Sequence, residues 1–440
     1  MASAPGPWGI CGVSLRTADS RDLLRAQDGL YTAIEKSGDG TRRRIIGSVR
    51  EALFLGADRA AIMARLAAAT TRIVTMTITE KGYCHDPATG ALDLSHPDIV
   101  HDLAHPGVPR SATGLLCAAL DRRRSSHCEP MTIVCCDNLP HNGALLRALV
   151  IEHACAIDRS LADWIAETAA FPSTMVDRIV PATTAKDITE NDAALAMHDA
   201  APVVFEPYRQ WVIEDSFATP RPEWEAGGAQ FVDDVAPFEL LKLRMLNGSH
   251  SAMAYLGCIA GYDHIHQVSG DARFQRFING LWDESGATLG TLPGVDIGAY
   301  RNSLWARFRN SSLPHRTWQI AMDGSQKLPQ RLLNPIRDRL RGSGAIPHLA
   351  LAVAGWMRYV GGVDEHGDRI DVRDPLSIRL AKVCADARND ADARALGLLG
   401  IQQIFGDDLR ADRRFTDAVI RWHRELVDDG VSATLDRHFS

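Results

Sequence analysis

Three residues whose side chains could act together chemically stand at offsets of five and eight in one short run: Lys242, Asn247 and His250. The surrounding residues are typical of a helix, and a lysine amine that packs into a core is costly. Such an amine makes sense as a proton carrier, because burial lowers its pKa toward neutral. Asn247 could hydrogen-bond a developing alkoxide, and His250 could hold a hydroxyl. These roles indicate alcohol–ketone redox chemistry that needs no metal.

The spacing of this run is compatible with one shared helix face. At about 100° per residue in an α-helix, His250 would lie roughly 80° and Asn247 roughly 140° around from Lys242. All three would then occupy one half of the helix. Gly248 inside the same run is a poor helix former and costs roughly 1 kcal/mol. Such a local inconsistency is expected at functional sites.

Zinc-dependent alcohol oxidation would instead require a cluster of histidine and cysteine ligands. One pair, His101 and His105, has the four-residue spacing of a zinc site, but it lacks the glutamate of His-Glu-x-x-His and Pro106 follows at once. The nine cysteines are an odd number, and none forms a Cys-x-x-Cys pair. We therefore expect reduced thiols in a cytoplasmic protein, packed as small apolar groups, and no metal cofactor.

The composition is that of an ordinary globular protein with room for two domains. The chain has 440 residues, of which 45% are hydrophobic and 23% are charged, and its formal net charge is -7. No basic run is longer than the three arginines at 42–44 and 122–124, which argues against a nucleic-acid partner. No apolar run reaches the roughly 18 residues of a membrane span, and the N-terminus does not resemble a signal peptide. A small molecule is therefore the expected partner.

The first half of the chain alternates short apolar runs with helical patterns. Buried strands are predicted over 8–15, 72–79 and 131–136, and helices over 51–69, 114–124 and 143–170. This β-α-β-α order argues for an α/β fold with a parallel sheet covered on both faces. Ligands of such sheets bind at the carboxyl ends of the strands, so polar residues in 16–19, 79–81 and 137–138 are candidates for ligand contact.

The character of the sequence changes near residue 236. Before it, 203–205 and 211–213 are predicted as short strands compatible with antiparallel pairing. From Pro237 onward the chain is predicted to be mostly helical, and a proline suits the first turn of a helix, where its missing N–H costs nothing. Helices are predicted over 237–262, 271–284, 348–363, 375–384 and 412–428. We therefore expect two domains, 1–236 and 237–440.

A nucleotide-binding sheet normally opens with a strand that leads into a Gly-rich turn, where the pyrophosphate meets a helix N-terminus. No Gly-x-Gly-x-x-Gly pattern or close variant follows a predicted strand here. The first visible strand, 8–15, behaves like the second strand of such a fold and ends near an acid, Asp19. We expect the first strand and its glycine turn to lie before Met1. The alternative is a chain that cannot bind the cofactor and only binds substrate or a partner.

The run Pro-Phe-Glu-Leu-Leu-Lys-Leu-Arg-Met-Leu-Asn-Gly-Ser-His at 237–250 resembles the signature of the polyol-specific long-chain dehydrogenases, the mannitol dehydrogenase family. Segments at 77–83, 136–143, 175–181 and 323–329 agree with it, so the similarity covers nearly the whole chain. The resemblance implies an α/β Rossmann-like N-terminal domain, here without its first strand and Gly-rich turn, and a mostly α-helical C-terminal domain. It also implies NAD as the cofactor.

The resemblance further implies a role for each matching residue. Lys242 would be the general acid and base, and Asn138 and Asn247 would stabilise negative charge on the reacting oxygen. His250 and Lys327 would contact substrate hydroxyls, with Asp177 nearby. The cofactor would be contacted by Asp19, Thr79 and Glu80, with Asp19 on the adenosine ribose. As an acid, Asp19 would repel the 2′-phosphate of NADP, which favours NAD.

The substrate stays open between sugar acids and polyols. Gln319 stands where mannitol dehydrogenases place a substrate-binding arginine, and the sequence around it is more similar to that of fructuronate reductases. Leu139-Pro140-His141, after Asn138, is closer to mannitol dehydrogenases. Arg244 could pair with the carboxylate of a uronate or could be structural. Fructuronate with mannonate, fructose with mannitol, and arabinitol, tagaturonate or altronate relatives are all compatible with the sequence.

Overall fold

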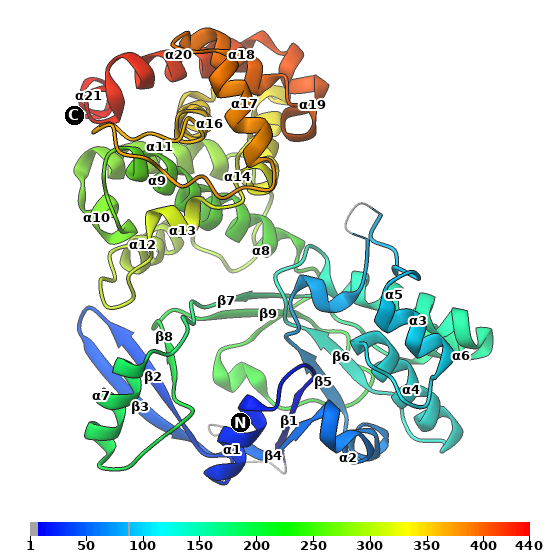
Figure 1. Cartoon of the computed structure of the whole chain (residues 1–440). Helices are drawn as coiled ribbons and strands as arrows, with labels where there is room; N and C mark the ends of the chain where they lie inside the picture. Colours follow the sequence, from blue (N-terminus) through cyan, green and yellow to red (C-terminus); the bar gives the residue numbers. More distant parts are fainter. Residues whose placement is uncertain (1–7, 87–88) are drawn as a thin grey trace. The chain divides into compact units, whose positions relative to one another are not determined.

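The computed structural model of the chain describes residues 8–86 and 89–440. The chain folds into two compact units, unit 1 up to Ala236 and unit 2 over Pro237–Ser440 (Figure 1). Unit 1 contains all the strands together with covering helices, and unit 2 is helical. This confirms the predicted fold class of each half.

Two of the parallel strand pairs in unit 1 are formed by strands that alternate with helices along the chain. Strand β1 (Ile10–Ser14) pairs with β4 (Val49–Phe54), and β5 (Ile73–Met76) pairs with β6 (Thr132–Cys135). Met76 lies opposite Cys135, so β5 and β6 end at the same edge. The helices that alternate with these strands are α1 (Asp19–Ala26), α2 (Leu55–Ala67), α3 (Pro97–Ala104), α4 (Ala112–Ser125), α5 (Asn142–Ile157) and α6 (Arg159–Thr168). In Figure 1, α3 to α6 gather beside β5 and β6.

One hydrophobic core joins these elements. Its fully buried side chains include Ile62, Leu120, Ile133, Leu149 and Ile165, one each from α2, α4, β6, α5 and α6. Burying each such aliphatic side chain stabilises the fold by roughly 1.5–3 kcal/mol. All four residues of β6 are buried. The loop that follows β6 is therefore anchored on a rigid base.

Strand β1 is less buried than its apolar sequence predicted. Ile10 and Val13 are 40% and 39% exposed, because among the described residues β1 is hydrogen-bonded to β4 on one edge only. In the strand order 3-2-1-4-5-6 of a dinucleotide-binding fold, β4 and β1 match strands 3 and 2, and β5 and β6 match strands 4 and 5. No described strand takes the place of strand 1.

A hairpin that the sequence patterns did not predict follows α1. Its strands, β2 (Tyr31–Ser37) and β3 (Gly40–Ile46), are antiparallel. Strand β8 (Val203–Phe205) pairs with β2 in parallel, so antiparallel pairing is wrong for this segment. The predicted helix 51–69 is also wrong at its start, because β4 runs to Phe54 and α2 begins at Leu55.

Further corrections concern the end of unit 1. The predicted helix 143–170 is two helices, because the Asp158 side chain accepts a hydrogen bond from the N–H of Ser160 and caps α6. Strand β9 (Gln210–Glu214) is antiparallel to β7 (Thr174–Asp177) and parallel to β10 (Gln230–Val232). The remaining elements of unit 1 are α7 (Ala185–Leu195) and the 3-10 turns η1 (Glu80–Tyr83) and η2 (Trp224–Gly227).

Unit 2 is built around one buried helix, α16 (Pro347–Tyr359). It packs against α9 (Gly248–Ile259), α11 (Ala272–Gly286) and α20 (Arg413–Asp428). Two segments are π-helices, η3 (Lys242–Asn247) and η4 (Pro329–Leu333). The other helices are α8 (Ala236–Leu241), α10 (Ile265–Gly270), α12 (Ile297–Phe308), α13 (Thr317–Ala321), α14 (Gly324–Leu328), α15 (Asn334–Arg341), α17 (Ser377–Asp386), α18 (Ala391–Leu399), α19 (Gln402–Ala411) and α21 (Gly430–Phe439).

All nine cysteines are free thiols. Burial raises the pKa of Cys11 and of Cys136 to about 12, so these thiols are protonated at neutral pH.

Over residues 8–86 and 89–440, no helix has the length and apolar character needed to cross a bilayer.

Candidate active site

The predicted catalytic run lies on an interrupted helix. The π-helix η3, Lys242–Asn247, stands between α8 and α9, and the N–H of Gly248 donates to the carbonyl of Leu243, five residues earlier. In a turn of this kind, residues five apart lie nearly above one another. Lys242 and Asn247 therefore share a face, and the 140° separation expected for an α-helix is wrong. Lys242, Asn247 and His250 are half-buried, whereas Arg244–Leu246 are buried.

Two side chains hold η3 from the core side. The carbonyl oxygen of Met245 accepts hydrogen bonds from the Ser249 hydroxyl at 2.6 Å and from the Trp282 indole N–H at 3.0 Å. Gly248 stands against the second π-helix: a Cβ atom there would lie 3.1 Å from the carbonyl oxygen of Arg331 in η4. This close approach accounts for a glycine within the helix.

The ring of His250 packs against two other rings. Its centroid lies 5.4 Å from that of Phe308 and 5.6 Å from that of His315. Its Nε2 is buried and has no hydrogen-bond partner among the described residues. Burial lowers the pKa of His250 well below its ordinary value, and the cationic or potentially cationic groups of His315, Arg331, Arg307 and Lys327 lower it further. The ring is therefore neutral at neutral pH and can bond a ligand hydroxyl.

Arg244 is already paired within the protein. Its side chain is 8% exposed, its guanidinium lies 2.7 Å from the carboxylate of Asp338, and it donates to the carbonyl and the hydroxyl of Thr288 at 3.0 and 2.6 Å. The structure therefore does not support the hypothesis that Arg244 binds a uronate carboxylate. Its role is to join η3 to α15 and to Thr288, two residues beyond the end of α11.

Lys327 lies in α14, in the electrostatic neighbourhood of His250. Its Nζ donates to the carbonyls of Met322 at 2.6 Å and Ile320 at 3.3 Å. Burial lowers the pKa of Lys327, and the nearby Arg331 lowers it further. An ammonium group has three donors, so one is available for a substrate hydroxyl. Gln319, where relatives were expected to place an arginine, is exposed on α13.

The loops after β5 and β6 in unit 1 are tied together by one carboxylate. Asp137, just after β6, accepts hydrogen bonds from the N–H of Ile78 at 2.9 Å, the N–H of Thr79 at 3.2 Å and the hydroxyl of Tyr83 at 2.6 Å. Burial raises the pKa of Tyr83, so its hydroxyl stays protonated and keeps donating. The predicted candidates Thr79 and Asn138 are therefore neighbours at one edge of the sheet.

Asn138 is exposed, and its loop is held from below by Asn142. The buried amide of Asn142 donates to the carbonyls of Asp137 at 2.9 Å and Thr174 at 2.8 Å, and it accepts from the N–H of Thr174 at 2.9 Å. A Cβ at Gly143 would lie 2.5 Å from the Phe171 carbonyl oxygen, so only glycine fits there. These contacts join the end of β6 to the start of β7.

The backbone of Thr79 is in a rare conformation, with φ at 63°. A positive φ is costly for a β-branched residue, and such strain gathers at functional sites. Here the hydrogen bond from the Thr79 N–H to Asp137 maintains it. The backbone of Glu80 opens η1, but its side chain lies outside what the structure describes.

The other two candidates in unit 1 differ in exposure. Asp19 is an exposed residue at the start of α1, in the loop region that follows β1. Asp177 is buried at the end of β7, opposite Gln210 of β9. The neighbouring Arg178 lies over the Phe205 ring at 3.7 Å and donates to the carbonyl of Glu206 at 3.1 Å.

One group in the described part of the chain has metal-ligand character. Ligand atoms of Cys84, His96 and Asp98 lie within 4.8 Å of one another. Asp98 also pairs with Arg16 at 3.2 Å, and the Nδ1 of His96 accepts a hydrogen bond from the N–H of Asp98. The spaced pair His101 and His105 is in ring contact at 5.1 Å, and His101 bonds Asp102.

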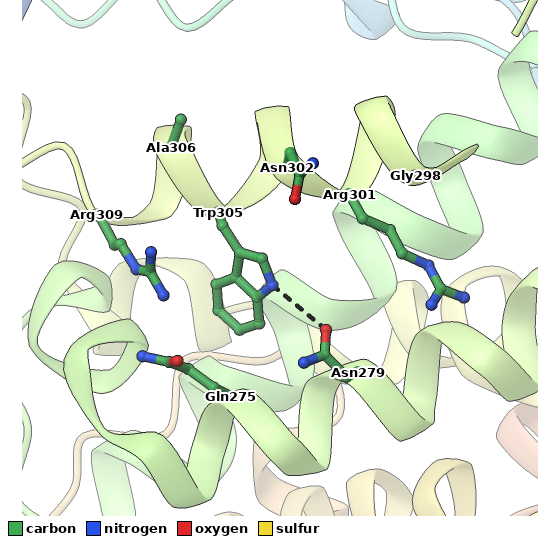
Figure 2. A pocket seen from close by; sticks show the side chains of 8 residues that line it. All are labelled: Gln275, Asn279, Gly298, Arg301, Asn302, Trp305, Ala306 and Arg309. Carbon is green, nitrogen blue, oxygen red and sulfur yellow. Dashed lines mark hydrogen bonds between the residues drawn. The ribbon is translucent and has the colours of Figure 1, made fainter. Parts of the chain in front are cut away.

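A hollow of about 600 Å³ lies between α11 and α12 of unit 2 (Figure 2). It is lined by polar side chains and by Trp305, whose indole donates to Asn279 at 3.3 Å. None of the predicted site residues lines it. Two residues of α12 lie close to His250: Arg307 acts on it electrostatically and Phe308 is in ring contact with it. Both are buried, and neither lines the hollow. This hollow is therefore separate from the predicted site.

Each unit thus gathers part of the predicted set. Unit 2 places Lys242, Asn247, His250 and Lys327 around η3 and α14, and unit 1 places Thr79 beside Asn138. One residue with a part in these arrangements was not predicted, Arg331, whereas Asp137 was predicted only as part of the candidate segment 137–138. Arg331 follows Lys327 by four residues, a helical spacing that could have drawn attention to it.

Comparison with known proteins covers both units. The model of the mannitol dehydrogenase Rossmann domain matches residues 4–226, and the model of the mannitol dehydrogenase C-terminal domain matches residues 234–427. The α/β unit is therefore of the Rossmann type, as predicted. Together the two matches extend over most of the chain.

Individual relatives agree with the family models. D-mannonate oxidoreductase of Escherichia coli (strain K12) is 46% identical over 436 residues, covering 98% of this chain and 89% of the relative. The structure of Pseudomonas fluorescens mannitol 2-dehydrogenase in a ternary complex with NAD and D-mannitol is 38% identical, with a TM-score of 0.80 over 98% of this chain and 88% of that one. The structure of a D-sorbitol dehydrogenase in substrate-free form is 31% identical, with a TM-score of 0.92 over 97% and 89%. By its sequence and by its fold, the chain belongs to the mannitol dehydrogenase family.

Proposed function

We propose that the chain is an NAD-dependent oxidoreductase that interconverts a secondary alcohol and a C2 ketone on an open-chain polyol or sugar acid. The observation that carries this proposal is the half-buried face formed by Lys242, Asn247 and His250, which η3 brings together. The names of the relatives, which are mannonate, mannitol and sorbitol enzymes, support the substrate class.

The proposed mechanism assigns each step of proton handling to a residue of this chain. In oxidation, neutral Lys242 takes the proton of the reacting hydroxyl, so that the O–H bond breaks as the C=O bond forms. NAD, when bound, accepts the hydride that leaves the same carbon. In reduction, the ammonium form of Lys242 returns the proton. Asn247 donates a hydrogen bond to the oxygen while it carries charge and so lowers the barrier by about 3 kcal/mol, and the family resemblance assigns the same role to Asn138. The neutral His250 ring holds a substrate hydroxyl.

The residues present fit the two ends of NAD. Asp19 offers an exposed carboxylate near the end of β1, suited to the ribose hydroxyls. Thr79 and Asn138 offer exposed polar groups at the β5–β6 edge, on loops held by Asp137. Asn142 and Gly143 help to keep the second of these loops in place. In this type of sheet a dinucleotide binds at the carboxyl ends of the parallel strands, where these polar groups lie.

The substitution Lys242→Ala tests the mechanism. NAD-linked oxidation of D-mannonate and D-mannitol should fall by at least about 1000-fold, because the acid and base is removed. The melting temperature should stay close to that of the wild type. Lys382→Ala is the matched control, since Lys382 is exposed and pairs only loosely with Asp386 at 3.7 Å. Near-wild-type turnover by the Lys242 variant would rule out the assignment.

A second hypothesis is that the chain binds its substrate or a partner without binding NAD. One observation favours it: no described strand takes the place of strand 1, next to the exposed residues of β1. Calorimetric titration with NADH separates the two hypotheses. Micromolar binding would exclude the second, and undetectable binding together with measurable mannonate or mannitol binding would support it.

A further inference from the structure

Arg331 is a half-buried cation whose charge is not balanced by an acid. Its Nη1 donates to the hydroxyl of Ser251 at 3.0 Å, and Ser251 is the buried residue next to His250. Among the described residues, no carboxylate lies within ion-pairing distance of Arg331. Burial lowers the pKa of Arg331, which reflects the cost of keeping this charge away from water. A guanidinium has five N–H donors, and over residues 8–86 and 89–440 this one uses a single donor, to Ser251.

Three other shielded arginines of unit 2 have an acid beside them. Arg244 pairs with Asp338 at 2.7 Å, Arg337 with Asp408 at 2.6 Å and Arg273 with Asp271 at 2.5 Å. This is the usual arrangement, because a shielded charge without a counter-charge is costly. Arg331 departs from it at a place where two π-helices meet. A bound anion would supply the missing counter-charge.

The surroundings of Arg331 are themselves positive. The cationic groups that act electrostatically on His250 include Arg331, Arg307 and Lys327. Asp323 and Asp374 act on Lys327 in the opposite sense, but Asp374 is engaged by the N–H and the hydroxyl of Ser325 at 2.7 and 2.5 Å. The region beside His250 therefore favours a negatively charged ligand over a neutral one.

We propose that Arg331, positioned by Ser251, binds the terminal carboxylate of an open-chain sugar acid and makes this chain select sugar acids over polyols. The proposal rests on the proposed function, in that His250 is taken to hold the same substrate. A planar guanidinium matches a carboxylate through two parallel hydrogen bonds, which gives both affinity and orientation. A neutral polyol offers no group that balances the charge of Arg331.

The experiment compares D-mannonate and D-mannitol as NAD-linked substrates of the wild type and of Arg331→Gln and Arg331→Lys. In Arg331→Gln, kcat/KM for mannonate should fall by about 100-fold, mainly through KM, and kcat/KM for mannitol should change by less than about 3-fold. Arg331→Lys keeps the charge but loses the paired N–H donors of the guanidinium, so its kcat/KM for mannonate should fall by about 10-fold. Arg337→Gln is the control. It removes an arginine of α15 that pairs with Asp408, and it should leave kcat/KM unchanged for both substrates.

Calorimetric binding of D-mannonate to the same proteins separates failure of this proposal from failure of the proposed function. If the wild type oxidises neither substrate but binds mannonate, and Arg331→Gln does not, the proposed function fails and the anion site stands. Equal losses on mannonate and mannitol would overturn the proposal, and so would unchanged mannonate kinetics in Arg331→Gln. Absence of both mannonate binding and mannonate oxidation in the wild type would also overturn it. Thermal melts of both variants check that the fold is kept.

Discussion

Gly248 and Arg331 pack main chain to main chain, so that a Cβ atom on Gly248 would stand 3.1 Å from the carbonyl oxygen of Arg331. This contact joins the residue after η3 to the middle of η4. The position of Asn247 in one π-helix is thereby coupled to the position of Arg331 in the other.

The substitution Gly248→Ala should separate stability from activity. Alanine adds about 1 kcal/mol of helix propensity, while its methyl group forces the main chain of η4 to move by a few tenths of an ångström. We expect the melting temperature to stay within about 5 °C of the wild type and kcat/KM to fall by roughly 10-fold, because small misplacements at a reacting centre are costly. Gly290→Ala is the control, since nothing lies within 4 Å of a Cβ there. Wild-type kinetics in Gly248→Ala would contradict the coupling.

The substitution Asp137→Asn should weaken cofactor binding. An amide can accept through one oxygen only, so it cannot serve all three donors, Ile78 N–H, Thr79 N–H and Tyr83 O–H. The strained Thr79 loop should then relax, and we expect the Kd for NADH in a fluorescence titration to rise by about 10-fold. Tyr83→Phe removes one donor and leaves the two backbone bonds, so its effect should be smaller. The prediction fails if Asp137→Asn binds NADH as tightly as the wild type.

Substitution of Arg244 should affect stability without affecting substrate choice. Arg244→Met removes the more buried of the two arginines that pair with Asp338, since Arg341 stays at 2.7 Å, and because the Asp338 side chain is 32% exposed, the loss should be about 2 kcal/mol in urea unfolding. The double variant with Asp338→Asn should be about as stable as Arg244→Met alone, because the remaining pair with the exposed Arg341 contributes little. The ratio of kcat/KM for mannonate to that for mannitol should stay constant. A change in that ratio would show that Arg244 takes part in substrate binding.

Buried His423 should make unit 2 sensitive to acid. Burial, and next the nearby Arg394, lower the pKa of His423 from 6.5 to about 4. The unfolded chain therefore binds more protons than the folded chain between pH 6.5 and about 4, so stability is complete above pH 6.5 and falls as the pH drops through this window. The loss attributable to His423 should be at most about 3 kcal/mol.

Melting temperatures at pH 7.5 and pH 4.5 test this dependence. His423→Leu should show a smaller drop between the two pH values than the wild type, with a residual drop from His250 and His315, whose pKa values are also lowered, first of all by burial. His198→Gln is a control of opposite sign, because Asp192 raises the pKa of the exposed His198. An unchanged difference in His423→Leu would exclude His423 as the cause.

The sequence predicted those parts of the fold that depend on apolar periodicity. The runs that became β5 and β6 are β-branched and apolar, and their parallel pairing followed from the alternation with helices. Strand β3 was missed because it carries Arg42, Arg43 and Arg44 in succession and is almost wholly exposed, so it has no two-residue apolar period. The start of α2 was misplaced because β4 runs directly into it without a turn.

The candidate site shows a similar division. Lys242, Asn247 and His250 were found because residue type and spacing are visible in a sequence. The π-helix was not, because a shift of the hydrogen bonds by one residue changes no residue type. Arg331 was missed for another reason: what distinguishes it is the absence of an acid around it in the described residues, which is a property of three-dimensional surroundings.

The π-helix η3 also decides which backbone changes the site can tolerate. A single-turn π segment contains one residue more than an α-helix between the same two ends. Deletion of Leu243 would therefore leave a continuous α-helix in which Lys242 and Asn247 stand four residues apart, about 40° around the axis, so that the two would still share a face. A shift of the hydrogen bonds to the α-helical pattern without loss of a residue would instead set them about 140° apart and separate the proposed base from its partner. The hydrogen-bond register of this helix is thus a stricter constraint on the site than its exact length.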